Sequence, residues 1–265
     1  MPVIQSQGCP INVETEGAAN APVLMLCNSL GTDLHMWDAQ APAFAKHFRL
    51  VRYDRRGHGK SGAPKGPYTM EMLGRDALAV MDGLGLKTVN WCGLSMGGMV
   101  GQWLGANAPE RIGKLILSNT QSYYPDKAMW EARMKPVREK GLGPAADPTM
   151  ERWFSKEFRE SAPDQIARMR EMFLKTQLDG FIGCCEAVRN MDMRDAHARI
   201  TAPTLLVRGE HSPILPRGMA ADMLARLAHA RLVEIPGTYH HLVLDAPGAF
   251  ARALEDFLSQ PIPST

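Results

Sequence analysis

A serine between two glycines is the first residue whose surroundings suggest chemistry. Residues 89–98 read VNWCGLSMGG, which places Ser95 between Gly93 and Gly97, after a strand-like run and before a helix-like one. Glycine lacks Cβ, so it fits where a chain turns sharply or where elements pack closely. A hydroxyl held at such a turn projects out of the fold, as a nucleophile must. Ser95 is therefore the predicted nucleophile, provided that other segments supply the groups that activate it.

Two segments are expected to stabilise the anion that attack by Ser95 would create. The helix that begins after Ser95 directs its positive dipole end toward the site, and the backbone N–H of Met96 is one expected donor. The segment CNSLGTDLHMW (27–37) follows an early strand, and its glycine allows close approach to Ser95. We assign the second oxyanion donor to the N–H of Leu30. The alternative is that residues 27–37 form only a strand-to-helix turn.

The base is expected to be a histidine late in the chain. The segment PGTYHHLVLDAPGAF (236–250) offers His240 and His241, between the last predicted strand and the last predicted helix. We favour His240 as the base. His58, in DRRGHGKSG (54–62), is instead expected to organise a loop.

The elements that must position these residues alternate along the chain. Apolar runs typical of strands buried on both faces alternate with helical periodicity, and this order predicts a mostly parallel sheet with helices on both faces. A hairpin is expected to precede them, because apolar pairs flank the turn signal QGCP. The predicted strands are residues 22–28, 48–54, 89–94, 114–119, 204–209 and 230–237, and the predicted helices include residues 69–84, 96–109 and 247–258.

The strand pattern stops in the middle of the chain. Charged amphipathic stretches there predict helices. The simplest organisation is an α/β core formed by residues 1–119 and 201–265, with a helical cap, or lid, formed by residues 120–200. Such a lid would cover one edge of the sheet. The prolines expected to break its helices are Pro136, Pro144, Pro148 and Pro163.

The composition excludes several classes of function. The 265 residues carry a formal net charge of +2, without the basic patch that nucleic-acid binding requires. No apolar run approaches the roughly 20 residues that span a membrane, and no signal peptide is visible. The five cysteines are odd in number and follow no zinc spacing. We therefore expect a cytoplasmic protein with reduced thiols, a small-molecule substrate, no metal and no cofactor, and leave a homo-oligomer open.

Several of these segments resemble a known superfamily. RYDRRGHGKSG (52–62), CGLSMGGMVGQWLG (92–105) and the loop that carries His240 are similar to the α/β-hydrolase superfamily. NSLGTDLHMWDAQ (28–40) and KGPYTM (65–70) resemble the 3-oxoadipate enol-lactonases in particular, and the likeness extends into the lid. The resemblance implies an α/β-hydrolase fold and hydrolysis of a small carboxylated enol-lactone in aromatic catabolism, without a cofactor.

The resemblance also carries over to single residues. It supports Ser95 as nucleophile, Leu30 and Met96 as oxyanion donors, and His240 as base, because His240 stands seven residues before Pro247 as the superfamily spacing requires. Trp130 and Arg133 fall where the lid of that family faces the substrate. The Arg133 guanidinium could pair with a substrate carboxylate, whose geometry it matches. The alternative is that Arg133 lies on a solvated face of a lid helix.

The sequence departs from the family pattern at the acid of the catalytic triad. The segment GEHSPILP (209–216) has Ser212 where the pattern has aspartate. A serine cannot stabilise an imidazolium by charge, and loss of this carboxylate costs about 10⁴ in kcat. Three explanations stay open. In the first, Glu210 replaces the aspartate, while Asp245 is better suited to a loop or helix cap. In the second, the enzyme is slow or catalyses a reaction that needs less stabilisation of the imidazolium. In the third, the protein has lost hydrolysis and binds a small molecule, or the serine was introduced on purpose.

The sequence thus predicts a serine hydrolase that cleaves a small lactone or ester, such as 3-oxoadipate enol-lactone, through an acyl-enzyme. Ser95 attacks the carbonyl carbon, and His240 moves the proton from Ser95 to the leaving oxygen. One alternative is a divergent carboxylesterase with another substrate. The other, favoured by Ser212, is a weakly active or non-catalytic protein that binds a small molecule in the same fold.

Overall fold

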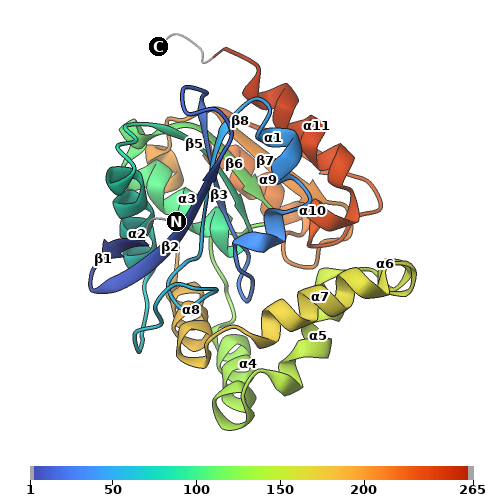
Figure 1. Cartoon of the computed structure of the whole chain (residues 1–265). Coiled ribbons are helices and arrows are strands. Elements are labelled where there is room, and N and C mark those ends of the chain that lie inside the picture. Colours follow the sequence, from blue (N-terminus) through green and yellow to red (C-terminus); the bar gives the residue numbers. More distant parts are fainter. Residues whose placement is uncertain (1–2, 262–265) are drawn as a thin grey trace.

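One twisted sheet runs through the computed structural model, which describes residues 3–261 (Figure 1). Its eight strands in this range follow the spatial order β1-β2-β4-β3-β5-β6-β7-β8. The β1–β2 and β2–β4 pairs are antiparallel and the remaining pairs are parallel, so the predictions of an opening hairpin and a mostly parallel sheet are confirmed. The strands are β1 (Val3–Ser6), β2 (Cys9–Glu16), β3 (Val23–Cys27), β4 (Arg49–Tyr53), β5 (Val89–Leu94), β6 (Ile112–Ser118), β7 (Thr204–Gly209) and β8 (Ala230–Ile235).

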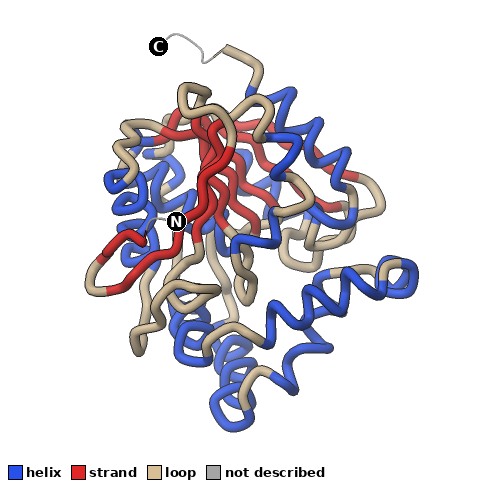
Figure 2. The backbone as a smooth tube through the Cα atoms, in the orientation of Figure 1, coloured by secondary structure: helices blue, strands red, loops and turns tan. Residues whose placement is uncertain are grey.

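Burial explains why the central apolar runs form strands. All six residues of β7 are buried, and β3, β5 and β6 are buried at nearly every position. A strand covered by helices on both sides has no face left for polar side chains. Figure 2 shows these strands as one red band between blue helices.

The helices of the core lie on both faces of the sheet. Helices α2 and α3 cover one face, and α1 and α11 cover the other (Figure 1). The predicted helix at 69–84 forms α2, which starts where the Thr69 hydroxyl accepts a hydrogen bond of 3.1 Å from Met72 N. The core helices are α1 (Ala41–Phe44), α2 (Met70–Gly83), α3 (Met96–Asn107), α9 (Arg217–Arg226), α10 (Leu242–Asp245) and α11 (Pro247–Leu258).

Five α-helices between β6 and β7 lie at one end of the sheet, in the segment where the sequence predicts the lid, and we keep that name for them (Figures 1 and 2). They pack mainly on one another, with α4 on α8 and α5 on α7. The lid contains α4 (Lys127–Lys140), α5 (Gly143–Trp153), α6 (Lys156–Ser161), α7 (Pro163–Leu174) and α8 (Leu178–Asn190).

Two lid prolines do not break their helices, so that part of the prediction was wrong. Pro136 lies inside α4 and Pro148 inside α5, whereas Pro144 and Pro163 occupy first turns, as proline prefers. Pro136 and Pro148 are exposed, and so are the residues four positions earlier, whose carbonyl groups lose their partner. Water can bond these carbonyl groups, which makes the interior prolines tolerable.

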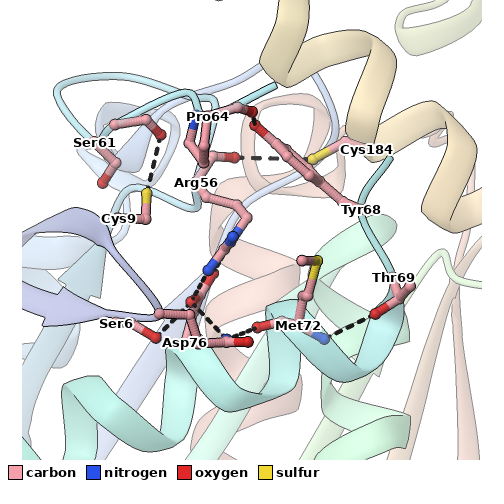
Figure 3. Close-up of polar contacts among 12 residues, drawn as sticks. Ser6, Cys9, Arg56, Ser61, Pro64, Tyr68, Thr69, Met72, Asp76 and Cys184 are labelled. Atoms are coloured by element: carbon pink, nitrogen blue, oxygen red, sulfur yellow. Dashed lines mark hydrogen bonds and ion pairs between the residues drawn. The ribbon is translucent and has the colours of Figure 1, made fainter. Parts of the chain in front are cut away.

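A buried ion pair anchors the loop at residues 54–62. Arg56 Nε donates to Asp76 on α2 at 2.5 Å, and the two side chains are 2% and 1% exposed. The Ser6 hydroxyl also donates to Asp76, at 2.6 Å (Figure 3). On the other side, Cys184 from lid helix α8 approaches the carbonyl oxygen of Arg56, at 3.9 Å. The loop is therefore held between the core and the lid.

Within residues 3–261, none of the helices combines the length and the apolar character that crossing a bilayer requires.

Candidate active site

Ser95 lies at the turn between β5 and α3 in a backbone conformation that few residues adopt. Its φ is 55° and its ψ is −114°, and it is one of three non-glycine residues with positive φ between residues 3 and 261. Such conformations cost about 1–3 kcal/mol and persist where the surroundings enforce them. A Cβ at Gly93 would lie 2.1 Å from Gly97 O, and one at Gly97 would lie 2.1 Å from Cys27 O. The glycines on both sides of Ser95 are therefore required by close packing.

Ser95 lines a small cavity between the sheet and the lid, which we call the site cavity. Its volume is about 30 Å³. The predicted nucleophile, base, oxyanion-donor residues and both lid residues thus line one cavity. The lining residues are Ser29, Leu30, Ser95, Met96, Met99, Tyr124, Trp130, Arg133, Arg152, Trp153, Val188, Ile214 and His240.

The loop that carries Leu30 is fixed by the buried loop that follows β4. Arg55 donates to the carbonyl oxygens of Asn28 and Ser29, the latter at 2.9 Å. Gly31 N donates to His58 Nε2 at 3.0 Å, so the ring proton of His58 lies on Nδ1. Burial, and then the charge of Arg55, hold the pKa of His58 well below its usual value. A neutral His58 therefore positions the loop, as its motif suggested.

The loop of His240 is held from both the sheet and the lid. Asn119, directly after β6, donates through Nδ2 to the carbonyl oxygens of Tyr239 and His240, at 2.9 and 2.8 Å. The carbonyl oxygen of Trp153, at the end of α5, accepts from His240 N at 3.1 Å. His241 packs instead against the Trp153 ring, at 4.3 Å between centroids. His240, and not His241, is therefore the histidine that lines the site cavity.

Among residues 3–261, the His240 ring has no acidic hydrogen-bond partner. Its Nδ1 atom is buried and forms no hydrogen bond within the described part of the chain. Burial, followed by the charges of Arg152 and Arg133, lowers the pKa of His240 to about 3. The ring is therefore neutral near pH 7, and nothing in its surroundings favours the imidazolium form.

The carboxylates considered as replacements for the triad aspartate, Glu210 and Asp245, form hydrogen bonds with other groups. Glu210 Oε2 accepts a hydrogen bond of 3.0 Å from Gly237 N, and its other oxygen lies 3.8 Å from Arg217. Asp245 accepts from Tyr239 N at 2.8 Å, and burial raises the pKa of Asp245 to about 7. Ser212 is buried, and its hydroxyl accepts a long bond of 3.4 Å from Ile214 N. The structure does not bring Glu210 to His240, and Asp245 has the loop role expected of it.

Two arginines give the site cavity a positive charge. The Arg133 guanidinium lies 5.0 Å from the Trp130 ring centroid and 5.8 Å from that of Phe181. Arg152 donates to the Thr149 hydroxyl at 2.8 Å. Burial, and then the charge of Arg133, lower the pKa of Arg152 to about 10, so it stays protonated at neutral pH. Among the described residues, neither guanidinium forms an ion pair with a carboxylate.

The family described as alpha/beta hydrolase fold matches residues 22–247. The chain belongs to the α/β-hydrolase family. A relative from Acinetobacter baylyi, 3-oxoadipate enol-lactonase 2, is 35% identical and covers 95% of this chain and 94% of its own length. The structure of the enol-lactonase from Burkholderia xenovorans LB400 superposes with a TM-score of 0.95 at 37% identity, over 98% of this chain and all of the other. The expected fold class and family resemblance are confirmed, and this α/β-hydrolase is a carboxylic ester hydrolase of the lactonase and esterase kind.

A thermophilic esterase from Thermogutta terrifontis has the same fold at lower similarity. That structure superposes with a TM-score of 0.89 at 25% identity, over 97% of this chain and 96% of the other. Both an enol-lactonase and an esterase are therefore among the relatives of this α/β-hydrolase.

Sequence reasoning missed two residues that shape the site of this α/β-hydrolase. Arg152 lies in the lid segment RWFS (152–155), and the sequence predicts no role for it. Asn119, at the end of the predicted strand 114–119, is not among the predicted site residues. The sequence feature that could have identified Asn119 is an amide side chain directly after a buried strand, because the ends of neighbouring parallel strands meet there. In residues 3–261, no three histidine, cysteine, aspartate or glutamate side chains cluster as metal ligands would.

Proposed function

We propose that this α/β-hydrolase cleaves a small carboxylated lactone or ester through an acyl-enzyme on Ser95. The observation that carries the proposal is the common cavity, in which a strained serine, a buried neutral histidine and two arginines without carboxylate partners lie together. The names of its relatives favour an enol-lactone, such as 3-oxoadipate enol-lactone, as the substrate. A cytoplasmic location, in which the five buried thiols stay reduced, belongs to the same proposal.

The reaction has two halves. The Ser95 oxygen attacks the carbonyl carbon while His240 Nε2 accepts the hydroxyl proton, and the N–H groups of Met96 and Leu30 donate to the developing oxyanion. His240 then gives its proton to the leaving oxygen as the ester bond breaks. In the second half, a water molecule deprotonated by His240 attacks the acyl carbon and releases Ser95. Each half uses His240 first as base and then as acid.

The two arginines select a substrate with a negative charge. A guanidinium binds a carboxylate through two parallel hydrogen bonds, and a buried site strengthens them. Arg133 is positioned by the faces of Trp130 and Phe181, and Arg152 by Thr149. A carboxylate between them would supply the partner that residues 3–261 do not provide.

The missing acid limits the choice of leaving group. Without a carboxylate at Nδ1, the imidazolium formed during attack is less stable, and the nearby arginines disfavour it further. An enolate leaves more easily than an alkoxide, so it needs less help from the imidazolium. We therefore favour a slow hydrolase, or one adapted to activated esters, over substitution of the acid by Glu210.

Two assays test the catalytic role of Ser95. A fluorophosphonate probe should label the protein, and p-nitrophenyl acetate should be hydrolysed faster with the protein than without it. Both signals should vanish in Ser95→Ala and persist in Ser29→Ala, which removes another hydroxyl from the same cavity. Labelling that survives in Ser95→Ala would reject Ser95 as the nucleophile.

The second candidate function is binding of a small anion without catalysis. The unpartnered Nδ1 of His240 and the serine at position 212 favour it. Absence of both labelling and hydrolysis in a folded protein would select this function over the first.

A further inference from the structure

A second, larger cavity adjoins the site cavity, and we call it the outer cavity. Its volume is about 550 Å³, within the range of cavities that bind small organic molecules. Tyr124, Trp130, Arg133, Arg152 and Ile214 line both cavities, so the two share a wall. The outer cavity therefore lies next to the predicted catalytic groups, and the arginines stand at the junction.

The site cavity alone is too small for a substrate. Its volume of about 30 Å³ suits roughly two water molecules. The reacting ester group could be accommodated there with small shifts of side chains. The rest of a substrate has to extend past the arginines into the outer cavity.

The walls of the outer cavity are mostly apolar. Met129 and Trp130 on α4 face the segment that carries Pro213, Ile214 and Met219. Met129 is 44% exposed, so much of this large apolar side chain is in contact with water. An apolar ligand would cover it and remove this surface from water.

One wall is fixed before any ligand arrives. The side chain of Gln121 donates to the carbonyl oxygen of Ile214, and Gln102 Nε2 donates to the carbonyl oxygen of Gln121 at 3.0 Å. This chain of bonds ties the segment after β7 to α3. A preformed wall reduces the entropy that a ligand must lose on binding.

Charge restricts what can occupy the outer cavity. The positive charges of Arg133 and Arg152 lie at its junction with the site cavity, and Asp126 lines the cavity as well. Asp126 accepts from Met129 N at 3.1 Å as the N-cap of α4, so its carboxylate is fixed there. A second anionic group near Asp126 would be repelled, whereas a neutral apolar group would not.

We propose that the outer cavity is a substrate subsite that binds an alkyl or aryl substituent of a carboxylated ester or lactone whose carbonyl carbon lies at Ser95. This inference rests on the proposed function and narrows its substrate class. The carboxylate lies at the arginines, the ester lies in the site cavity, and the substituent covers Met129 and Met219. The substrate is thus larger and more apolar than a bare carboxylated lactone.

A series of substrates tests the subsite. The probes are mono-p-nitrophenyl esters of succinic acid that carry no substituent, or an ethyl, butyl or hexyl group. Each methylene buried in the outer cavity should raise kcat/KM about fourfold, mainly through KM. A flat series in the native protein would overturn the inference.

Filling the cavity gives a matched test. Met129→Trp and Met219→Trp should abolish the advantage of the hexyl ester and leave the unsubstituted ester unaffected. Leu174→Trp, at a similarly exposed position on α7, is the control and should leave the whole series unchanged. Equal losses for all four esters in both cavity variants would also overturn the inference.

Measurements of binding distinguish rejection of the subsite from rejection of the proposed catalysis. If no ester is hydrolysed, the proposed catalysis fails, and the subsite is tested by calorimetric titration with succinate and hexylsuccinate. Tighter binding of hexylsuccinate to the native protein than to Met129→Trp would support the subsite. Equal affinity of both acids for the native protein would reject it.

Discussion

His240 is the residue on which the chemistry of this hydrolase depends most. Its Nδ1 atom has no partner in residues 3–261, and the charges that shift its pKa, on Arg152 and Arg133, are positive. A triad aspartate would do the opposite, because its charge stabilises the imidazolium. The base is therefore present without the negative charge that would stabilise its imidazolium form, and a single substitution can supply that charge.

Ser212→Asp should restore that support. Ser212 is buried, and His211 N next to it donates to Thr238 O at 2.9 Å, which ties its loop to the loop of His240. A carboxylate there should raise kcat for p-nitrophenyl esters, by up to about 10⁴ if the geometry is ideal. Steady-state kinetics with Ser212→Asn as the uncharged control would measure the gain. No gain in a folded Ser212→Asp protein would mean that His240 does not use this position.

The native protein and Ser212→Asp should differ in how kcat/KM depends on pH. The low pKa of His240, about 3, keeps the base neutral, so kcat/KM of the native protein should not fall between pH 7.5 and about 5.5 while the protein stays folded. In Ser212→Asp the pKa of His240 should rise, so protonation should reduce kcat/KM as the pH falls through the usual histidine range. A fall of the native rate with a midpoint near 6.5 would contradict this.

Arg152→Met should weaken recognition of the substrate carboxylate. A hydrogen bond to a charged group contributes about 1.5–3 kcal/mol, so kcat/KM for a carboxylated ester should fall about 10–100-fold relative to p-nitrophenyl acetate. Arg170→Met removes an arginine that pairs with Asp147 on the lid surface and is the matched control. An unchanged ratio of the two substrates in Arg152→Met would show that Arg152 does not bind the carboxylate.

At the scale of elements, the loops of the site are held jointly by the core and the lid. The lid supplies the carbonyl oxygen of Trp153 to the loop of His240, and Gln177 donates to Ser61 O at 3.0 Å. Arg168 on α7 pairs with Asp38 of the core at 2.5 Å. A backbone held from two sides keeps its side chains in place at little further entropic cost. The lid is therefore part of the framework of the site as well as its cover.

Asp76→Ala tests the anchor of the loop at 54–62. The substitution leaves the guanidinium of Arg56 buried without its carboxylate, which should lower the free energy of unfolding by about 3–5 kcal/mol. Glu71→Ala, on the same helix, removes a carboxylate from an exposed pair with Arg75, and should cost about 0.5 kcal/mol or less. Urea denaturation followed by circular dichroism measures both. Equal losses would mean that the buried pair contributes no more than the exposed one.

The elements were predictable wherever local pattern decides structure. Thr69 before an amphipathic run marked the start of α2, and the fully buried run at 204–209 marked β7. The glycines around Ser95 predicted a sharp turn with close packing, and a Cβ at Gly93 or Gly97 would indeed collide with the backbone. Pro136 was misjudged because its cost depends on whether the freed carbonyl group reaches water, which the sequence does not state.

The contacts of the site were less predictable, because they join distant segments. Asn119 donates hydrogen bonds to the carbonyl oxygens of Tyr239 and His240. Every residue has a backbone carbonyl group, so the sequence does not show which of them is the acceptor. Arg152 is recognisable only once α5 is seen to end beside Arg133. The placement of Glu210 depends on one bond to Gly237 N, which the sequence spacing could not distinguish from a bond to His240. The division at residues 119 and 201 stays a prediction.

At the scale of the whole molecule, buried histidines link stability to pH. Burial is the largest cause that lowers the pKa of His58, His197, His240 and His241, to about 4 for His197. Each takes up a proton near pH 6.5 in the unfolded chain but not in the folded protein. Their contribution to stability is thus fully present above pH 6.5 and is lost as the pH falls below it. Asp245 acts in the opposite sense, because its pKa of about 7 lets the folded protein bind a proton first.

The protein should therefore unfold in mild acid. Between about pH 5.5 and 4.5, four histidines and one opposing carboxylate leave about three more protons on the unfolded chain, a loss of roughly 4 kcal/mol per pH unit. Since folded domains have only about 5–15 kcal/mol of stability, urea midpoints should fall steeply over this range. His197→Gln should reduce the slope by about 1.4 kcal/mol per pH unit. A slope that stays the same in His197→Gln would mean that this ring takes up its proton in the folded protein, and the stability lost in acid would then come from His58, His240 and His241.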